Sequence, residues 1–335
     1  MTTSEVVVAV VLEVAYLFLL MIPGVLLKKL KMIPEGFGKG ISNLVLYIAQ
    51  PILVFTAYLK EFNSEILINS AYVLVLSVIA HLIFAAVSLS LFGKTEDGRR
   101  RMLRFAVIFS NAAFMGIPLI RAVFESRFPG ATLYASIYNI TFNLFLWTLG
   151  VRICTKNRDK DRDGIDDHVE AKSEGASIMK AILHPVTIAA ALGLIFFIFQ
   201  INTYIPDKAW SFVDKTLTGI SNLVAPLSML VIGLRLPDIS FKGVHKDLNM
   251  YLFLALRHII LPFAVIGVIK LCGVVGITIH EIVASVVVIL AAAPAASSAT
   301  MFAEKYDCDA TYVSRLVTIS TLLSIATMPL MLLFI

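Results

Sequence analysis

Long apolar stretches constrain the fold of this chain more than any other feature. Residues 73–92 and 182–201 carry no formally charged side chain, although His81 and His184 interrupt them. A stretch of about 20 apolar residues is long enough to cross the hydrocarbon core of a bilayer and too long for most buried helices of soluble proteins. Backbone groups in lipid must be satisfied within the segment, so we predict an all-α integral membrane protein.

The composition fits about ten membrane spans. The chain has 335 residues, and 59% of them are hydrophobic. Ten spans of about 20 residues each would use roughly 200 positions, which leaves little for a separate soluble domain. The ten predicted segments are residues 6–27, 41–59, 66–92, 103–124, 131–153, 179–201, 210–234, 248–270, 281–302 and 311–335.

The distribution of basic residues predicts the orientation. The formal net charge is +5, and most lysines and arginines lie in the odd-numbered loops or at the adjoining span ends. Basic residues gather in cytoplasmic loops of membrane proteins. We therefore expect a multi-pass protein of the cell membrane with both termini outside, and we attribute the positive charge to membrane orientation rather than to nucleic-acid binding.

A repeated hexapeptide indicates internal symmetry. Residues 40–45 and 219–224 both read Gly-Ile-Ser-Asn-Leu-Val, in the second and seventh predicted spans. An offset of five spans turns the second copy upside down, and inverted repeats of this kind are typical of secondary transporters. We predict two inverted five-helix repeats, 1–153 and 179–335, joined by a charged cytoplasmic linker, 154–178.

Two spans are predicted to be broken. The fourth contains Asn111, Gly116 and Pro118 close together, and the ninth contains Pro294 and Ser297 in a run of small residues. Proline removes a backbone donor and glycine weakens a helix. If both helices unwind and cross, two half-helix N-termini point at the bilayer centre and favour an anion there. Two ordinary kinked helices are the alternative.

Three further asparagines are candidates for substrate binding. Asn43 lies in the second span, while Asn139 and Asn143 lie one turn apart in the fifth. The alternative is hydrogen bonding between helices, which contributes only about 0.6 kcal/mol on average.

Ionisable residues inside spans are candidates for coupling or charge balance. Glu13 and His81 are candidates for proton coupling, and Arg257 is placed to balance a substrate anion or to pair with a carboxylate. Structural pairing is an equally good explanation for each of the three.

The charged linker contains a pattern typical of a calcium loop. Acidic residues recur at alternate positions around a glycine, as the hard oxygen ligands of calcium require. A solvated charged linker is the alternative. The candidate calcium ligands are Asp159, Asp161, Asp163, Asp167 and Glu170.

Several stretches resemble the auxin efflux carrier family, which includes the plant PIN carriers and bacterial malate and malonate permeases. The Asn-to-Pro motif within residues 110–120 is the most specific of them. The other resembling stretches are residues 225–236, 257–262, 292–306 and 318–330.

The resemblance implies ten spans of the bile-acid-symporter and sodium–proton-antiporter type, arranged as a homodimer. The broken fourth and ninth helices would cross at the substrate site. The substrate-binding asparagine of the family falls on Asn111, and its crossover prolines fall on Pro118 and Pro294. Family substrates are organic anions. The chain lacks the very long central loop of some plant members, which favours the bacterial type.

These features predict a secondary active carrier of a small organic anion, such as a carboxylate, working by alternating access. A proton or sodium ion is the expected coupling ion, no cofactor is required, and calcium is a candidate ligand of the linker alone. One alternative is a channel or membrane sensor regulated through the linker. The other is an intramembrane enzyme, but no span holds the nucleophile, paired acids or metal ligands that such an enzyme needs.

Overall fold

A computed structural model describes residues 3–155, 179, 182–238 and 246–335. Within these ranges the regular structure is helical, and the one sheet-like contact is an isolated antiparallel bridge between Ser110 and Ala295. The chain is therefore an all-helical protein over its described part.

The helices of the first half precede the linker. They are α1 (Thr3–Leu19), α2 (Ile22–Lys29), α3 (Phe37–Leu44), α4 (Gln50–Ala57), α5 (Ser64–Ser90), α6 (Asp97–Ile108), α7 (Ile117–Phe124), α8 (Ala131–Phe145) and α9 (Val151–Cys154), with π-helical turns η1 (Val45–Ala49), η2 (Ala112–Gly116) and η3 (Leu146–Gly150).

The helices of the second half follow the linker. They are α11 (Pro185–Phe199), α12 (Asp207–Ser221), α13 (Val224–Arg235), α14 (Leu248–Ala255), α15 (Leu261–Val274), α16 (Glu281–Ala292), α17 (Ser298–Lys305) and α18 (Ala310–Met331), with the π-helical turn η7 (Leu256–Ile260) and the 3₁₀ turns η4 (Ile201–Tyr204), η5 (Leu236–Asp238) and η8 (Leu332–Phe334).

Seven of the described helical segments are long and apolar enough to cross a membrane. Shorter apolar helices, 112–124, 185–199 and 281–292, fall within the fourth, sixth and ninth predicted spans. Large apolar side chains such as Leu12, Phe199 and Phe212 are exposed, as lipid-facing residues would be. The chain is thus a multi-pass membrane protein, while the count of ten spans and the inverted repeat stay predictions.

Prolines explain most of the π-helical turns. Each of η1, η2 and η7 ends directly before a helix whose second residue is a proline, namely Pro51, Pro118 and Pro262. A proline has no N–H to donate and its ring clashes with the carbonyl four residues earlier, so the helical ladder widens there. The local sequence therefore determines where these long helices deform.

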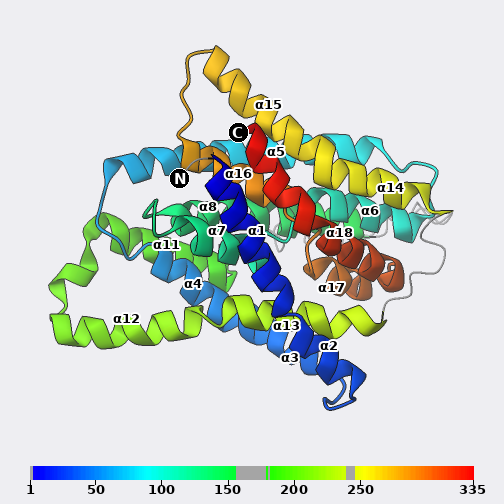
Figure 1. The fold of residues 1–335 in the computed structure, drawn as a ribbon, viewed down its shortest axis with the longest axis horizontal. Coiled ribbons are helices and arrows are strands. Elements are labelled where there is room, and N and C mark those ends of the chain that lie inside the picture. The colour runs from blue at the N-terminus through cyan, green and yellow to red at the C-terminus, as the bar shows by residue number, and fades with distance from the viewer. Residues whose placement is uncertain (1–2, 156–178, 180–181, 239–245) are drawn as a thin grey trace, which may run out of the picture.

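Helices that are far apart in the chain pack against each other in the bundle. In Figure 1, α1 lies beside α18, and α1 also contacts η8 near the C-terminus. Helix α13 packs against α2, where a Cβ added to Gly24 would lie 2.3 Å from the carbonyl oxygen of Leu230. A Cβ added to Gly233 would lie 2.1 Å from the carbonyl oxygen of Met21. Only glycine allows the two backbones to approach this closely.

Candidate functional site at two broken helices

The first break separates α6 from α7. Helix α6 ends at Ile108, and Phe109 is extended, with φ −97° and ψ 115°. Asn111 follows in a non-helical conformation and precedes η2, which continues into α7. Pro118 is the second residue of α7, directly after the widened turn of η2.

The second break separates α16 from α17. Helix α16 ends at Ala292, and Ala293 turns the chain away with φ −58° and ψ 148°. Pro294 lies within the non-helical stretch, and Ser297 is at the N-cap position of α17 without a side-chain capping hydrogen bond. Proline and the small residues around it therefore end one helix and begin another inside the bundle.

The two breaks meet each other. The Asn111 N–H donates to the carbonyl of Pro294 at 2.7 Å, and the Ala296 N–H donates to the carbonyl of Phe109 at 2.9 Å. These bonds flank the Ser110–Ala295 bridge. Backbone groups released by the breaks are thus satisfied partly by the opposite segment, as the protein interior requires. We call residues 109–111 with residues 293–297 the crossover.

Asn111 presents an unused donor at the crossover. Its side chain is 2% exposed, and its amide nitrogen has no hydrogen-bond partner among the described residues. Its backbone carbonyl is occupied, because it accepts from the N–H groups of Met115 and Gly116 at 3.1 Å. A buried polar group without a partner is uncommon and costly, so the amide is a candidate for ligand binding.

Ser297 is similar but less isolated. It is 5% exposed, and its hydroxyl has no partner in the described part of the chain. Its carbonyl accepts a hydrogen bond from Arg235 at 3.0 Å. The crossover therefore holds three buried polar atoms with no hydrogen-bond partner among the described residues, namely the Ser110 and Ser297 hydroxyls and the Asn111 amide nitrogen.

Gly116 allows close packing beside the first break. A Cβ at this position would lie 2.4 Å from the Cδ2 atom of Leu290 on α16. The neighbouring atom is the end of a flexible side chain, so an alanine would require Leu290 to move.

The two asparagines of α8 differ in whether their side-chain amides have hydrogen-bond partners. Helix α8 packs against both η2 and α16. Asn139 is fully buried, and neither of its amide atoms has a partner within the described ranges. Asn143 instead donates its amide to the backbone carbonyl of Asn139 at 3.0 Å. Asn139 is therefore the better candidate to serve a ligand.

Asn43 is not among the buried polar residues near the crossover. It lies on α3 and its side chain is exposed. The helical period places the neighbouring Ser42 inward, where its hydroxyl donates to the Gly38 carbonyl at 2.8 Å.

A cavity adjoins the first broken helix. It has a volume of about 310 Å³ and brings Glu13 of α1 together with Pro118 and Arg121 of α7. Ser221 and Asn222, from the second copy of the repeated hexapeptide, line its other wall. Arg121 donates to the Ser221 hydroxyl at 3.0 Å. Sequence reasoning missed Arg121 because it lies near the end of the predicted span 103–124 and was counted only toward the orientation of the chain.

A second cavity adjoins the second broken helix. It has a volume of about 320 Å³ and is lined by Arg235, Thr300, Glu304 and Arg315, among others. Arg235 donates to the Thr300 hydroxyl at 2.5 Å. Each broken helix thus has a polar cavity containing arginine at its side.

The other two predicted charge-bearing residues lie outside both cavities. His81 is 1% exposed, stacks on Phe145 with ring centroids 5.1 Å apart, and lies 2.7 Å from the Ser77 carbonyl through Nδ1. Arg257 is fully buried, and its hydrogen bonds reach backbone carbonyls rather than a carboxylate.

Sequence reasoning also missed a polar brace behind the crossover. The Ala295 N–H donates to the Ser320 hydroxyl at 2.9 Å, and Nε2 of His258 lies 2.8 Å from the same hydroxyl. Nδ1 of His258 lies 2.9 Å from the Thr327 hydroxyl. Hydroxyls in an apolar helix gave no local signal of this role, because such groups usually bond to their own backbone.

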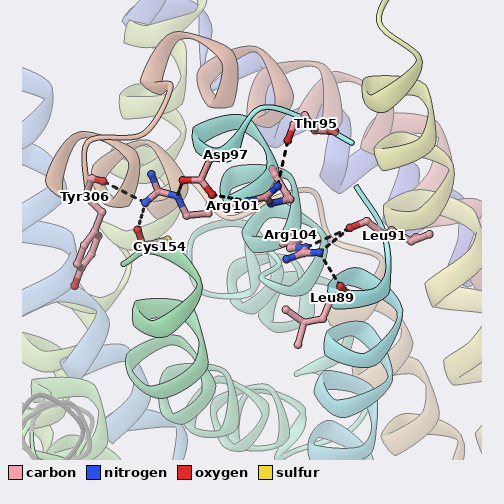
Figure 2. A network of polar contacts seen from close by, with 9 residues as sticks. Leu89, Leu91, Thr95, Asp97, Arg101, Arg104, Cys154 and Tyr306 are labelled. Atoms are coloured by element: carbon pink, nitrogen blue, oxygen red, sulfur yellow. Dashed lines mark hydrogen bonds and ion pairs between the residues drawn. The ribbon is translucent and has the colours of Figure 1, made fainter. Parts of the chain in front are cut away.

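Two arginines hold the start of the first broken helix (Figure 2). Arg101 of α6 pairs with Asp97 at 2.9 Å and donates to the Cys154 carbonyl at the end of α9. Arg104 donates to the carbonyls of Leu89 and Leu91, at 2.8 and 3.0 Å, where α5 ends. Cations near helix C-termini compensate the partial negative charge there.

The predicted calcium ligands lie outside the described residues. Within the described ranges no three His, Cys, Asp or Glu side chains are grouped so that they could hold a metal ion.

An all-helical membrane protein whose broken helices meet around unsatisfied polar groups has the form of a transporter. The chain belongs to the membrane transport protein family, that of the auxin efflux carriers, which it matches over residues 9–332. An uncharacterised transporter of Methanothermobacter thermautotrophicus is 26% identical over 324 residues, covering 96% of this chain and 95% of the relative.

A second relative is similar over nearly the whole chain. An uncharacterised transporter of Methanocaldococcus jannaschii is 25% identical over 323 residues, covering 93% of this chain and 94% of the relative. The chain is therefore a membrane transporter of a family of transporters rather than enzymes.

Proposed function

We propose that this protein is a secondary active carrier of a small organic anion, such as a carboxylate, that works by alternating access around the crossover. The observation that carries the proposal is the buried Asn111 amide, which has no partner among the described residues at the point where two broken helices meet. The proposed binding residues are those of both breaks, with Asn139 beside them.

Helix geometry favours an anion at this place. Helix α17 begins at Ser298, and η2 with α7 begins just after Asn111, so the N–H groups of both segments start at the crossover. Helix N-termini carry partial positive charge and unsatisfied donors, which suit a carboxylate. Arg121 adds a full positive charge in the adjacent cavity. An Asn amide contributes a directional donor without a second charge.

Alternating access is supported by the two cavities. One adjoins Pro118 on the first broken helix and the other adjoins Thr300 on the second, with the crossover between these two helices. In the proposed topology of ten spans as two inverted repeats, 1–153 and 179–335, the first cavity faces outside and the second faces the cytoplasm. Both termini are then outside the cell membrane, and the carrier is a homodimer.

A proton is the preferred coupling ion. Glu13 lines the cavity that contains Pro118 and Arg121, so its protonation could follow substrate entry. His81 is enclosed by aromatic rings and lines neither cavity. The proposed carrier needs no cofactor, and calcium binding at the linker would add regulation rather than transport.

Uptake into proteoliposomes tests this proposal. Labelled malate, malonate and an indole carboxylate would be supplied with and without an imposed pH gradient. Wild type would be compared with Asn111→Ala and with a matched control, Asn249→Ala, which removes an asparagine at the start of α14 far along the chain from the crossover. Thermal unfolding in detergent would verify that each variant is folded.

Saturable uptake of one anion by wild type and Asn249→Ala, with loss in Asn111→Ala, is the expected result. Equal uptake by wild type and Asn111→Ala would exclude Asn111 from the site while leaving the carrier assignment in place. No uptake of any anion under either condition would overturn the substrate class. Uptake that rises linearly without saturation would favour a channel instead.

A further inference from the structure

Arg257 is the largest fully buried side chain in the described part of the protein. It lies in the π-helical turn η7, directly before α15. Its guanidinium makes four hydrogen bonds, all to backbone carbonyls. Nε and Nη2 donate to Ala293 at 3.0 and 2.8 Å, Nη2 donates to Ala291 at 2.8 Å, and Nη1 donates to Val107 at 2.9 Å.

These three carbonyls share one structural property. Val107 lies in the last turn of α6, Ala291 lies in the last turn of α16, and Ala293 is the C-cap residue directly after α16. Carbonyls at a helix C-terminus lack intrahelical partners and carry the negative end of the helix dipole. The helices before both breaks, α6 and α16, therefore end at the same cation.

The charge of Arg257 is balanced without an acid. None of the ion pairs between described residues includes it. The guanidinium carbon lies 5.3 Å from the ring centroid of Phe84, an added cation–π contact. A buried charge with no compensation would be very costly, so the converging carbonyls must supply the stabilisation.

We propose that the Arg257 guanidinium is a built-in cation that holds the crossover together. It occupies a cluster of carbonyl oxygens of the kind that elsewhere replaces the hydration shell of an alkali metal ion. Two consequences follow. The carrier needs no alkali cation at this position, and a sodium ion that drives transport must bind elsewhere. Arg257 is thus a positioning residue, and it is not free to bind the substrate anion.

Thermal unfolding of the purified protein tests this role directly. Wild type, Arg257→Ala, Arg257→Lys and Arg257→Met would be heated in a buffer whose only cation is choline, with guanidinium, sodium or potassium chloride then added at low millimolar concentration. The control variant is Phe84→Ala, which opens space beside the guanidinium but leaves the carbonyls occupied. The readout does not depend on the substrate, so it is independent of the proposed transport function.

Arg257→Ala should melt below wild type and recover at least half of the lost melting temperature with guanidinium or an alkali cation. A ligand that binds only the folded state stabilises it in this way. Wild type and Phe84→Ala should not respond. Arg257→Lys should melt above Arg257→Met, since the two side chains have similar length and differ in charge.

Two outcomes would overturn the proposal. In the first, no cation stabilises Arg257→Ala. In the second, Arg257→Met is as stable as Arg257→Lys, which would mean that the side chain only fills space. If Arg257→Ala does not fold, the comparison of lysine with methionine decides the matter, and equal loss of folded protein in both would overturn the assigned role of the charge.

Discussion

The two broken helices differ in how the chain returns to a helical conformation after the break. The first break restarts at once as a π-helical turn after Asn111, and a polar side chain lies at the restart. The second break holds its proline within the non-helical stretch and restarts at Ser298 among small residues. The first segment thus contributes a directional side-chain donor, and the second contributes backbone groups and close packing.

The two segments also differ in how many of their polar groups have hydrogen-bond partners. The Asn111 amide has no partner within the described residues. The second segment is held from several sides, because Arg235 binds the Ser297 carbonyl and Ser320 accepts from the Ala295 N–H. The amide donor without a partner therefore lies on the first segment, while the second offers the Ser297 hydroxyl and is otherwise fixed by its neighbours. We infer that ligand binding depends mainly on the first segment and stability mainly on the second.

The largest effect should come from the side chains at the two breaks. Asn111→Ala should reduce anion uptake by roughly ten- to hundredfold, because a hydrogen bond to a charged group contributes about 1.5–3 kcal/mol. Ser297→Ala should reduce it by less than about tenfold, since in the proposed division of roles its hydroxyl does not contact the charged group and a neutral hydrogen bond contributes about 0.5–1.5 kcal/mol. Concentration-dependent uptake by both variants measures the difference. A larger loss for Ser297→Ala would reverse the proposed division of roles.

The arginine beside each broken helix provides the next comparison. Both arginines line a cavity, but Arg121 bonds to Ser221 of α12, whereas Arg235 bonds to Ser297 and Thr300 of the second broken helix. Arg121→Gln should raise KM for the anion roughly fivefold, which corresponds to about 1 kcal/mol of lost attraction. Arg235→Gln should instead lower the melting temperature with little change in KM. KM values equal to that of wild type in both variants would show that neither arginine attracts the substrate.

Packing between the two segments gives a smaller effect. Gly116→Ala forces Leu290 to move, since the new Cβ would lie 2.4 Å from its Cδ2 atom. Overpacking of this kind costs about 1–3 kcal/mol, with the lower end expected for a flexible side chain. Chemical unfolding of Gly116→Ala, Leu290→Val and the double variant would measure their coupling.

The double variant should lose less stability than the sum of the single variants, because Leu290→Val removes the crowded atom. Gly219→Ala is the control, as nothing lies within 4 Å of the Cβ position there. Additive losses would mean that Gly116 and Leu290 do not constrain each other.

The smallest effect is expected for a substitution of Glu125, which directly follows α7 of the first broken helix. The Glu125 carboxylate accepts from the N–H and hydroxyl of Thr132 at 2.7 and 2.5 Å and pairs with Lys60. Burial alone would raise the pKa of Glu125, but these hydrogen bonds and the charge of Lys60 outweigh it and hold the pKa below its usual value. The carboxylate therefore stabilises the folded state at neutral pH.

A lowered pKa sets the sign of the pH dependence. The stabilisation is complete above the unfolded pKa of about 4.3 and is lost as the pH falls through the lower folded pKa. Wild type should melt above Glu125→Gln at neutral pH, and the gap should shrink below about pH 4. Thermal unfolding at graded pH measures the gap, and uptake at neutral pH should change little. A constant gap at all pH values would show that protonation of Glu125 is not responsible.

Local signals in the sequence were sufficient to predict a helical membrane protein and to locate the places where its helices deform. In lipid, the backbone N–H and C=O groups of an uncharged apolar stretch find hydrogen-bond partners within the stretch only if it is helical. Prolines such as Pro118 and Pro262 follow directly after π-helical turns and so mark where a helix deforms. Asn111 could be selected because a polar residue close to glycine and proline inside a span is uncommon. The family assignment is confirmed by the match over residues 9–332.

Other features depend on residues far apart in the chain, and no local pattern contains them. The sequence identified Arg257 as a buried charge, but only packing decided that its partners are carbonyls from α6 and α16. Asn43 and Asn139 have the same chemistry in sequence, yet one is exposed and the other fully buried. The sequence by itself determined which helices form and where they break, since hydrophobicity and proline act locally. The tertiary structure decided which groups meet at the breaks, because a hydrogen bond depends on distance and direction in space.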